Sequence, residues 1–526
     1  MKKNILIGGA WPYANYKLHI GHISALLPGD IIARYFRLKG DNVVFVSGTD
    51  CHGTPTTITA KKEGVTPYDI AKKYHEFDKT DMKRIGISYD LYAATMDEEH
   101  KTEVQRMFKL IYDNNYIYEK EEEQDYCDTC KIFLSDREIE GTCPHCKETT
   151  KGDQCEHCLI VIDVLQDKNC SICKKTTVLK NNKHLYFSLS KFQKELEKYI
   201  NKNLSNWRKN AQNETNKFLK LGLIDRAATR QLDWGVDVPI DGYEDKKIYV
   251  WIEAVMGYLT TCKRVCGNDY ENFITDSNTI SYYIHGKDNI VFHTIIFPAL
   301  IMAMRNNYNL PNYIISSEYL NMKDEKMSKS KGNLMTLDEM LNLYDADTIR
   351  YNLILNGPEK KDVNFSVEDL VTTHNKFLVG VIGNFINRNL SFIVKKFDGI
   401  IKEGNIDKNI INKTKELYND VGNLIAKGEL RAALELVTEY AILGNKFYDE
   451  SEPWIKVKDN IEEFNNITYT CVYMMANLSN LLYPFIPEAA NKIKKMLNIT
   501  NFNWEEINIT GDIKINSLEL LFNRIE

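Results

Sequence analysis

Residues 4–47 constrain the fold of this chain more than any other part of its sequence. They begin with an apolar segment, Asn4–Gly9, that ends in two glycines, and they close with residues 42–47, which are apolar and β-branched like a buried parallel strand. Between these segments, apolar residues recur at helical spacing over Ile20–Leu38. A strand, a helix and a second strand in this order form a right-handed crossover unit. The sequence therefore predicts an α/β fold built on a Rossmann-type, doubly wound parallel sheet.

The rest of the chain divides into a further α/β region and a helical region. Strands and helices alternate again over residues 249–315, and strand signals nearly vanish after Asn364. The long amphipathic stretches 410–428 and 429–449 indicate a helical bundle that continues to the C-terminus. A chain of 526 residues is too long for one hydrophobic core, so we expect several domains.

The composition is typical of a soluble globular protein, with 43% hydrophobic residues, 27% charged residues and a net charge of −6. This charge argues against a protein that coats nucleic acid nonspecifically, although a local basic patch can still bind phosphates. No apolar run approaches the length needed to span a bilayer. The N-terminal apolar segment is interrupted too soon, by Gly8 and Gly9, to be a signal peptide. We therefore expect a cytoplasmic protein with no membrane partner.

Eight of the twelve cysteines form four Cys-x-x-Cys pairs in one short segment. The pairs are Cys127/Cys130, Cys143/Cys146, Cys155/Cys158 and Cys170/Cys173. Four such pairs indicate two tetrahedral Zn²⁺ sites with four cysteine ligands each, and redox-active dithiols are the alternative. The spacing does not decide which pairs share an ion. Both ions are expected to be structural, because such sites have no open coordination position and the segment has too little apolar sequence to fold unaided.

Two short motifs at the ends of the α/β region are candidates for the chemistry. Residues 19–22 (His-Ile-Gly-His) open the first predicted helix, so both histidines lie on its first turn, where free N–H groups favour an anion. Residues 326–330 (Lys-Met-Ser-Lys-Ser) form a basic loop whose lysines are flexible point charges suited to polyphosphate. Taken singly, either motif could be a solvated surface segment.

Together the two motifs resemble the paired signatures of class I aminoacyl-tRNA synthetases, and they occur in the same order. Further segments are similar to the methionyl-tRNA synthetase family, over effectively the whole chain; they include residues 10–15, 48–55, 249–251, 286–288 and 292–293. The resemblance implies a methionine–tRNA ligase for initiation and elongation of translation. Such an enzyme activates L-methionine with ATP to methionyl-adenylate and transfers the methionyl group to the 3'-terminal adenosine of tRNA(Met). Mg²⁺ would accompany ATP.

The same resemblance implies the residues of the catalytic site. The catalytic groups would be His19, His22, Lys326 and Lys329. The ATP-binding residues would be His19, Gly21, His22, Gly286, Lys287, Asp288 and Lys329. The methionine pocket would be formed by Tyr13, Asp50, Trp251, Ala254, Tyr258 and His293, with Asp50 on the ammonium group. Without the resemblance, the aromatic residues would be interpreted as core packing. The carboxylate of methionine is the nucleophile, so the protein supplies alignment and charge stabilisation.

The size of the insertion favours methionine over other amino acids. Relatives for leucine, isoleucine and valine hydrolyse mischarged products in a large inserted editing domain. Here the insertion, residues 118–234, is mostly occupied by the cysteine pairs, which leaves no room for that domain. Methionine is long, unbranched and polarizable, so one aromatic-lined pocket can select it with less need of editing.

In the helical region, Asn384, Arg388 and Trp454 match the residues with which the family reads the anticodon. Asn384 and Arg388 are four apart and share a helix face, while Trp454 follows a proline at a break between helices. An indole that stacks an unpaired base beside Asn and Arg is a common arrangement for single-stranded RNA. Without the resemblance, Trp454 would be interpreted as a core residue.

The resemblance also implies the domains, the metal pairing and the oligomeric state. The catalytic domain would comprise residues 1–117 and 175–325, the zinc insertion 118–174, the loop and stem-contact connection 326–365, and the anticodon domain 366–526. The zinc sites would be nested, with the inner two cysteine pairs on one ion and the outer two on the other. The appended tRNA-binding domain of longer relatives does not follow residue 526, which predicts a monomer.

A few positions depart from the family pattern. Tyr16 stands where glycine is usual, so it would be strained if that position required a positive φ. Gln231 and Glu253 stand where aspartate is usual, and Val255 where proline is usual. None of these changes removes a group that the chemistry requires. Two other functions remain open: a class I synthetase for another amino acid, and a zinc-bearing RNA-binding protein that no longer catalyses.

Overall fold

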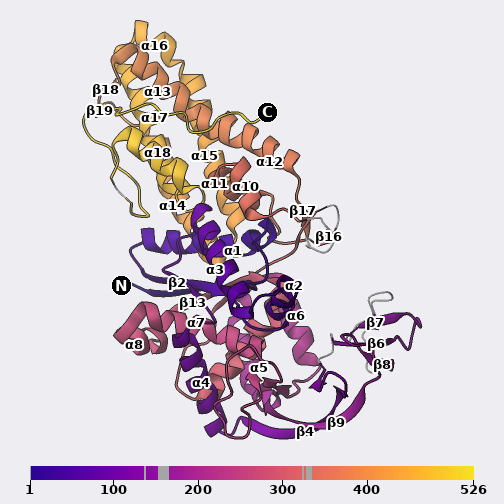
Figure 1. The fold of residues 1–526 in the computed structure, drawn as a ribbon. Helices are drawn as coiled ribbons and strands as arrows, with labels where there is room; N and C mark the ends of the chain where they lie inside the picture. The colour runs from indigo at the N-terminus through magenta and orange to yellow at the C-terminus, as the bar shows by residue number, and fades with distance from the viewer. Residues whose placement is uncertain (1, 135–137, 152–164, 323–324, 327–333, 501) are drawn as a thin grey trace.

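The structure is a computed structural model that describes residues 2–134, 138–151, 165–322, 325–326, 334–500 and 502–526. Figure 1 shows an elongated molecule, with the C-terminal helices at one end and the α/β region at the other. A long two-stranded ribbon leaves the α/β region and carries a small group of strands, β6 to β8, at one side.

A five-stranded parallel sheet, in the order β14-β13-β1-β2-β3, forms the centre of the α/β region. Its strands are β1 (Asn4–Gly9), β2 (Asn42–Thr49), β3 (Leu91–Ala94), β13 (Ile280–Gly286) and β14 (Tyr313–Ser317). The chain starts in the middle, adds two strands on one side, and then returns to add two on the other. This order confirms the Rossmann-type sheet, and it places a ligand-binding crevice where the order reverses, at the carboxyl ends of β1 and β13.

Strand β1 is apolar because helices cover both faces of the sheet. Ile5 and Ile7 belong to one core, with α1 (Ile20–Leu38), whereas Leu6 between them belongs to another, with α7 (Val250–Cys266). Successive side chains of a strand point to opposite faces, so a strand buried on both faces is apolar throughout. The first core continues without interruption into the C-terminal helices.

The remaining elements of the α/β region surround the sheet or form the insertion. The helices are α2 (Thr54–Glu63), α3 (Pro67–Arg84), α4 (Glu98–Asp113), α5 (Gln193–Asn203), α6 (Lys209–Lys220), α8 (Tyr270–Thr275) and α9 (Phe297–Met304). The ribbon pairs β4 (Ile117–Cys127) with β9 (Val178–Phe187), flanked by β5 (Ile132–Phe133) and β10 (Arg226–Ala227). At its tip lie β6 (Ile139–Thr142), β7 (Thr149–Lys151) and β8 (Gln166–Cys170). Strands β11 (Thr229–Arg230) and β12 (Lys247–Ile248) lead into α7.

A small sheet and two helices connect the α/β region to the C-terminal helices. They are β15 (Leu320–Met322), β16 (Glu325–Lys326), β17 (Val363–Asn364), α10 (Leu337–Leu343) and α11 (Ala346–Leu355). The helical region then comprises α12 (Val367–Thr373), a π-helical turn (His374–Gly383), α13 (Asn384–Phe397), α14 (Lys408–Lys427), α15 (Leu430–Ser451), α16 (Pro453–Asp459), α17 (Ile461–Leu482) and α18 (Pro487–Leu497). The short strands β18 (Ile400–Ile401) and β19 (Ile513–Lys514) pair beside it. The long amphipathic helices α14 and α15 confirm the predicted bundle.

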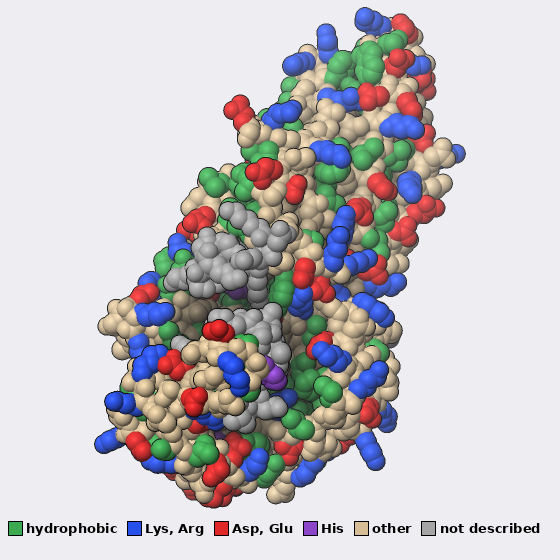
Figure 2. Space-filling model, turned by 90° about the vertical axis from the view of Figure 1, so that its right-hand side faces the viewer, with side chains coloured by type: hydrophobic (Ala, Val, Ile, Leu, Met, Phe, Trp, Pro, Cys, Tyr) green, Lys and Arg blue, Asp and Glu red, His purple; other side chains and the backbone are tan. Residues whose placement is uncertain are grey.

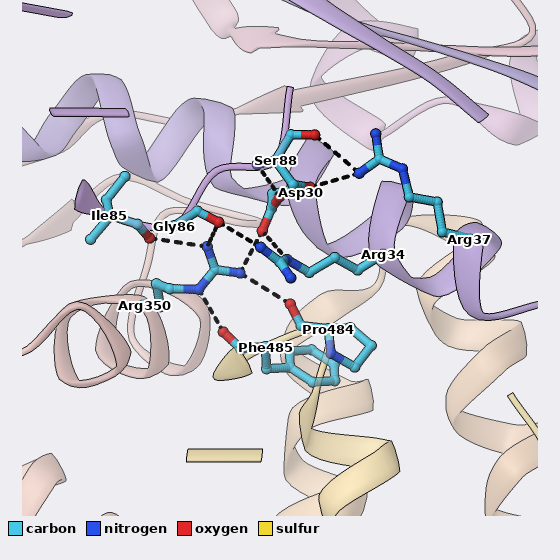
Figure 3. A network of polar contacts seen from close by, with 9 residues as sticks. All are labelled: Asp30, Arg34, Arg37, Ile85, Gly86, Ser88, Arg350, Pro484 and Phe485. Carbon is cyan, nitrogen blue, oxygen red and sulfur yellow. Dashed lines mark hydrogen bonds and ion pairs between the residues drawn. The ribbon is translucent and has the colours of Figure 1, made fainter. Parts of the chain in front are cut away.

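A buried ion pair joins helix α1 to the connection and to the helical region (Figure 3). The guanidinium of Arg350, on α11, lies 2.6 Å from Asp30 on α1, and both side chains are fully buried. Arg350 also donates to the carbonyl oxygens of residues 85, 86, 484 and 485. Asp30 accepts a further bond from Arg34. Burial alone would raise the pKa of Asp30, but the two arginines outweigh burial and hold it at about 2. We call this network the joint.

Two helical stretches of the described residues, Lys287–Met304 and Val367–Phe397, are long and apolar enough to cross a membrane by length and composition alone. The expectation that no apolar run approaches that length was therefore wrong. However, 67% of the apolar window of the first stretch and 44% of that of the second are buried inside the protein. Their side chains belong to the two cores described above, so packing explains their composition.

Candidate functional site

A cavity of about 420 Å³ opens at the carboxyl ends of the parallel strands, where the strand order reverses. Every residue predicted for the methionine pocket lines it, namely Tyr13, Asp50, Trp251, Ala254, Tyr258 and His293. Five of the predicted ATP-binding residues line it as well, namely His19, Gly21, His22, Gly286 and Asp288. The structure thus brings together residues from six separate segments of the chain in one cavity.

A buried tyrosine and a buried histidine line one end of the cavity and are hydrogen-bonded to each other. The Nδ1 of His293 lies 2.8 Å from the carbonyl oxygen of Asn289, so this nitrogen carries the proton. The Tyr258 hydroxyl then donates to Nε2 of His293, at 2.8 Å. Burial lowers the pKa of His293 to about 4, which keeps the ring neutral near pH 7. This end of the cavity therefore offers an uncharged surface with its polar atoms already paired.

Aromatic rings form one wall of the cavity. Trp251 stacks on Phe292 with ring centroids 4.2 Å apart, and Tyr13 meets Trp251 edge-on at 6.2 Å. Phe292 begins a π-helical turn, Phe292–Ile296, which is an irregularity that often marks functional sites. Flat, polarizable rings around a narrow space suit a flexible thioether chain, since sulfur makes favourable contacts with aromatic rings.

Asp50 supplies a buried acidic group to the cavity. It follows strand β2, and its carboxylate accepts a hydrogen bond from the backbone N–H of His52, at 3.3 Å. Burial, and then the nearby carboxylate of Glu253, raise the pKa of Asp50 well above its usual value. A cationic ligand would oppose this shift, because a positive charge beside the carboxylate favours its ionised form and offsets the second negative charge.

His19 and His22 cap the first turn of helix α1 reciprocally. The backbone N–H of Gly21 donates to Nδ1 of His19, at 3.1 Å, and the backbone N–H of His19 donates to Nδ1 of His22, at 3.2 Å. The two rings stack with centroids 3.7 Å apart. Because Nδ1 of each ring accepts a hydrogen bond, a neutral ring carries its proton on Nε2. Both imidazoles are thereby fixed as Nε2–H donors.

The fold of this turn favours glycine at position 21. A Cβ atom at Gly21 would stand 2.9 Å from two ring atoms of His19, which is closer than real Cβ atoms approach. The family resemblance implies Gly21 as an ATP-binding residue. The structure adds a nearer reason for glycine, because the His19 ring itself lies over it.

The end of β13 and the residues after it line the cavity only in part. Gly286 and Asp288 line it, and the hydroxyl of Tyr319 donates to Asp288. Lys287 is not among the lining residues; its Nζ lies 2.9 Å from Glu318 and 2.6 Å from Asp362. Of the basic loop, only the backbone of Lys326, in β16, lies within the described residues, and Lys329 lies outside them.

The outer two cysteine pairs come together at the tip of the ribbon. The sulfur atoms of Cys127, Cys130, Cys170 and Cys173 all lie within 4.8 Å of one another, with Cys127 3.4 Å from Cys173 and Cys130 3.9 Å from Cys170. Four thiolates around one Zn²⁺ have sulfurs roughly 3.8 Å apart, given a Zn–S distance of about 2.3 Å. The donor set and its spacing fit a tetrahedral Zn²⁺ ion. Cys143 and Cys146 lie around the turn after β6, and Cys155 and Cys158 lie outside the described residues.

The three predicted anticodon residues gather around helix α15. Arg388 contacts Asp449 at 2.7 Å and lies over the ring of Tyr448, whose centroid is 5.8 Å from that of Trp454. Asn384 donates to Asn445, at 2.9 Å. Trp454 is 41% exposed, which excludes its interpretation as a core residue. Figure 2 shows hydrophobic side chains at this end of the molecule, where α16 lies in Figure 1.

Several residues of the cavity escaped the sequence analysis. Phe292 was noted only as part of a matching segment, and Trp11, Asn289, Glu318 and Tyr319 were not assigned to the site. Glu318 and Tyr319 directly follow strand β14, so their position at the carboxyl end of a parallel strand was a signal that could have found them. The π-helical turn that presents Phe292 has no recognisable signature in the sequence.

The four departures from the family pattern differ in where they lie. Tyr16 does not have a positive φ, so the strain considered for it is absent. Val255 lines the cavity beside the aromatic wall, and Gln231 is exposed and does not line it. Glu253 is fully buried behind Asp50.

Comparisons with known proteins agree along the whole chain. Residues 5–390 match the family described as class I tRNA synthetases (M), and residues 400–518 match the anticodon-binding domain of methionyl-tRNA ligase. The chain is 45% identical to methionine–tRNA ligase 1 of Alkaliphilus oremlandii and 44% identical to methionine–tRNA ligase of Bacillus cereus (strain 03BB102), each match covering 99% of this chain and 97% of the relative.

The fold is similar to that of methionyl-tRNA synthetase of Mycobacterium tuberculosis, solved in complex with methionyl-adenylate, with a TM-score of 0.84. The match covers the full length of both chains at 24% identity. Sequence motifs, fold and full-length relatives therefore agree, and this chain belongs to the methionyl-tRNA synthetase family of class I tRNA synthetases.

Proposed function

We propose that this chain is a methionine–tRNA ligase, which activates L-methionine with ATP and attaches it to the 3'-terminal adenosine of tRNA(Met), for initiation and elongation. The observation that carries the proposal is the single cavity in which an acidic group, an aromatic wall and two fixed imidazoles meet. The relatives named methionine–tRNA ligase match at full length, which supports the same activity.

The site residues divide the work of adenylate formation. Tyr13, Trp251, Ala254, Tyr258 and His293 enclose the methionine side chain, and Asp50 binds the ammonium group. The methionine carboxylate then attacks the α-phosphate of ATP. His19 and His22 donate from Nε2 to the phosphates, because capping of the helix fixes both rings in that tautomer. No protein nucleophile takes part, so the rate depends on alignment and on stabilisation of phosphate charge.

The rest of the ATP site combines two segments. Gly286 and Asp288 line the cavity beside Gly21 and bind the nucleoside portion of ATP. Lys287 is bound to Glu318 and Asp362, so its contribution to ATP binding requires a change of partner. Lys326 and Lys329 would close over the pyrophosphate, and Mg²⁺ would enter with ATP, bound by its phosphates.

The cysteine pairs hold two structural Zn²⁺ ions. The outer site consists of Cys127, Cys130, Cys170 and Cys173, whose sulfur spacing fits a tetrahedral ion. The inner site would consist of Cys143, Cys146, Cys155 and Cys158. Neither ion takes part in the reaction, because four thiolates leave no open coordination position.

The helical region reads the anticodon. Trp454 stacks an unpaired base, while Asn384 and Arg388 address base edges from the neighbouring helix. On the face shown in Figure 2, basic and acidic side chains are interspersed rather than gathered in one basic patch. Such a surface favours recognition through particular contacts over nonspecific attraction to phosphates.

The proposed organisation follows from these roles. Residues 1–117 and 175–325 catalyse, residues 118–174 bind zinc, residues 326–365 connect and contact the tRNA stem, and residues 366–526 bind the anticodon. We place the enzyme in the cytoplasm, because ATP, methionine and tRNA meet there. We further propose that it is a monomer with no membrane partner.

The proposal is tested by pyrophosphate exchange into ATP. The assay omits tRNA and uses each of the twenty amino acids in turn. Methionine should support exchange and the others should not. Exchange with a different amino acid would contradict the pocket assignment while retaining the mechanism. A folded, zinc-replete protein that exchanges nothing would instead favour a non-catalytic RNA-binding function. Asp50→Asn serves as the matched variant, since it should lose exchange while keeping its fold.

A further inference from the structure

A buried glutamate and histidine form a close pair directly behind Asp50. The Nδ1 of His52 and Oε1 of Glu253 are 2.5 Å apart, and the two side chains are 1% and 0% exposed. His52 lies two residues beyond Asp50, and Glu253 lies in the first turn of α7, the helix that carries Trp251 and Tyr258. The pair therefore ties the end of strand β2 to the helix that forms the methionine pocket.

This pair acts on Asp50 through both geometry and charge. The backbone N–H of His52 donates to the Asp50 carboxylate, so fixing the His52 ring also fixes that backbone bond. The Glu253 carboxylate is close enough to disfavour the ionised form of Asp50. Neither Glu253 nor His52 lines the cavity, so neither would contact the substrate directly.

The electrostatic balance of this region is incomplete. The second oxygen of Glu253 and Nε2 of His52 are buried without a hydrogen-bond partner among the described residues. Within the residues that the structure describes, His52 is the one ion-pair partner of Glu253. Two buried acidic groups thus lie near each other, and the one imidazole beside them contacts Glu253 while Asp50 has the backbone N–H of His52. Such an arrangement is costly unless a further positive charge binds nearby. The α-ammonium group of an amino acid bound at Asp50 would supply that charge.

We propose that Glu253, held in place by His52, is a positioning residue for the α-ammonium group of the substrate. The pair fixes the Asp50 carboxylate from behind and adds a second negative charge to the ammonium site. The inference rests on the proposed function, because it takes the cavity to bind an α-amino acid. It assigns selectivity for the ammonium group to three residues instead of one.

Binding of two matched ligands tests this role. L-methionine and its deamino analogue, 4-(methylthio)butanoate, differ only in the ammonium group, and calorimetry gives the Kd of each for the zinc-replete full chain. The wild type should prefer methionine strongly. Glu253→Gln keeps the shape but removes the charge, so it should weaken methionine binding about tenfold and change binding of the analogue less than about twofold. Glu253→Asp retains the charge and should keep most of the preference.

A structural role would give a different pattern. If Glu253→Gln changed the Kd of both ligands by the same factor, so that the preference for methionine stayed as in the wild type, the inference would be overturned. His52→Gln, measured in parallel, decides the matter if Glu253→Gln does not fold. It should also reduce the preference for methionine, and an unchanged preference would overturn the inference. ATP affinity, which should stay constant in every variant, reports on the integrity of the cavity.

The wild type separates this inference from the proposed function. A wild type that binds neither ligand contradicts the proposed function itself. If the wild type prefers methionine and the Glu253→Gln variant shows the same preference, only the role of the pair is contradicted.

Discussion

The cysteine-rich tip of the insertion and the joint at Arg350 hold their parts of the chain together by opposite means. At the tip, the buried core formed by the described residues consists of three cysteines with Leu134, Ile139 and Leu165. At the joint, an apolar core runs without interruption from the parallel sheet into the helical region, and Arg350 is satisfied by Asp30 and four backbone carbonyls inside it.

The difference shows where each region obtains its order. With so few buried apolar side chains among its described residues, the tip would not offset its loss of conformational entropy unaided, and we expect it to depend on bound metal. The joint needs no ligand, because its charges and hydrogen bonds are paired within the protein. Loss of metal should therefore act locally on the insertion, whereas a change at the joint should destabilise the whole molecule.

Removal of zinc should give the largest and most local effect. A structural Zn²⁺ site contributes on the order of 10 kcal/mol, so chelation or a Cys127→Ser/Cys170→Ser double variant should unfold the tip. Hydrogen exchange should then accelerate in strands β6 to β8 and remain slow in β1 and β13. Cys266→Ser, outside the cluster, is the control. Undiminished protection of the tip after complete chelation would contradict its dependence on metal.

Replacement of Arg350 by methionine should give the next largest effect, and a global one. It leaves Arg34 as the one charged partner of Asp30 among the described residues, and it removes the Arg350 donor from the carbonyl oxygens of residues 85, 484 and 485, while that of residue 86 keeps a bond from Arg34. The loss should lower the free energy of unfolding by about 3–5 kcal/mol. The matched control is Arg37→Met, whose side chain bonds Ser88 and Asp90 at a partly exposed site; it should cost about 1 kcal/mol or less. Equal denaturant midpoints for the two variants would argue against a special role for the joint.

Acid should weaken the joint over a narrow range of pH. The pKa of Asp30 is lowered to about 2 in the folded protein, so its ionisation stabilises the fold above the unfolded pKa and loses this contribution as the pH falls. The contribution is about 2 kcal/mol and should disappear between about pH 4 and pH 2. Denaturant titrations of wild type and Asp30→Asn at several pH values test it. The difference in stability between them should narrow across that range, and a constant difference would count against the ion pair.

Trp454 should have the smallest effect on stability, because it belongs to neither region. Its ring is exposed beside Tyr448, so Trp454→Ala should change the free energy of unfolding by no more than about 0.5 kcal/mol. The same change should weaken binding of tRNA(Met) by about 1–3 kcal/mol, the range for a stacked base. Filter binding and denaturant titration of one preparation measure both. Normal tRNA affinity would remove Trp454 from the anticodon site.

Local pattern was sufficient to predict the parallel sheet, whereas the site residues were predicted from the resemblance to the family. The first helix occupies Ile20–Leu38 as predicted from its apolar spacing, and every pocket residue that the resemblance implied lines one cavity. The gathering of the outer cysteine pairs required the resemblance to the family, since spacing alone left the pairing open.

The joint and the pair behind Asp50 could not be predicted from sequence. Arg350 and Asp30 are far apart in the chain, and nothing in a lone buried arginine identifies its partner. His52 and Glu253 meet only because strand β2 and helix α7 pack side by side. Contacts of this kind depend on tertiary packing, which leaves no periodic signal along the chain.

The most direct test of the account is a structure of the zinc-replete protein after incubation with methionine and ATP. The account predicts methionyl-adenylate in the cavity at the ends of β1 and β13, with the ammonium group on Asp50 and the thioether chain against Trp251 and Tyr258. An adenylate bound in another orientation, with its ammonium group away from Asp50, or a cavity that binds neither substrate, would contradict it.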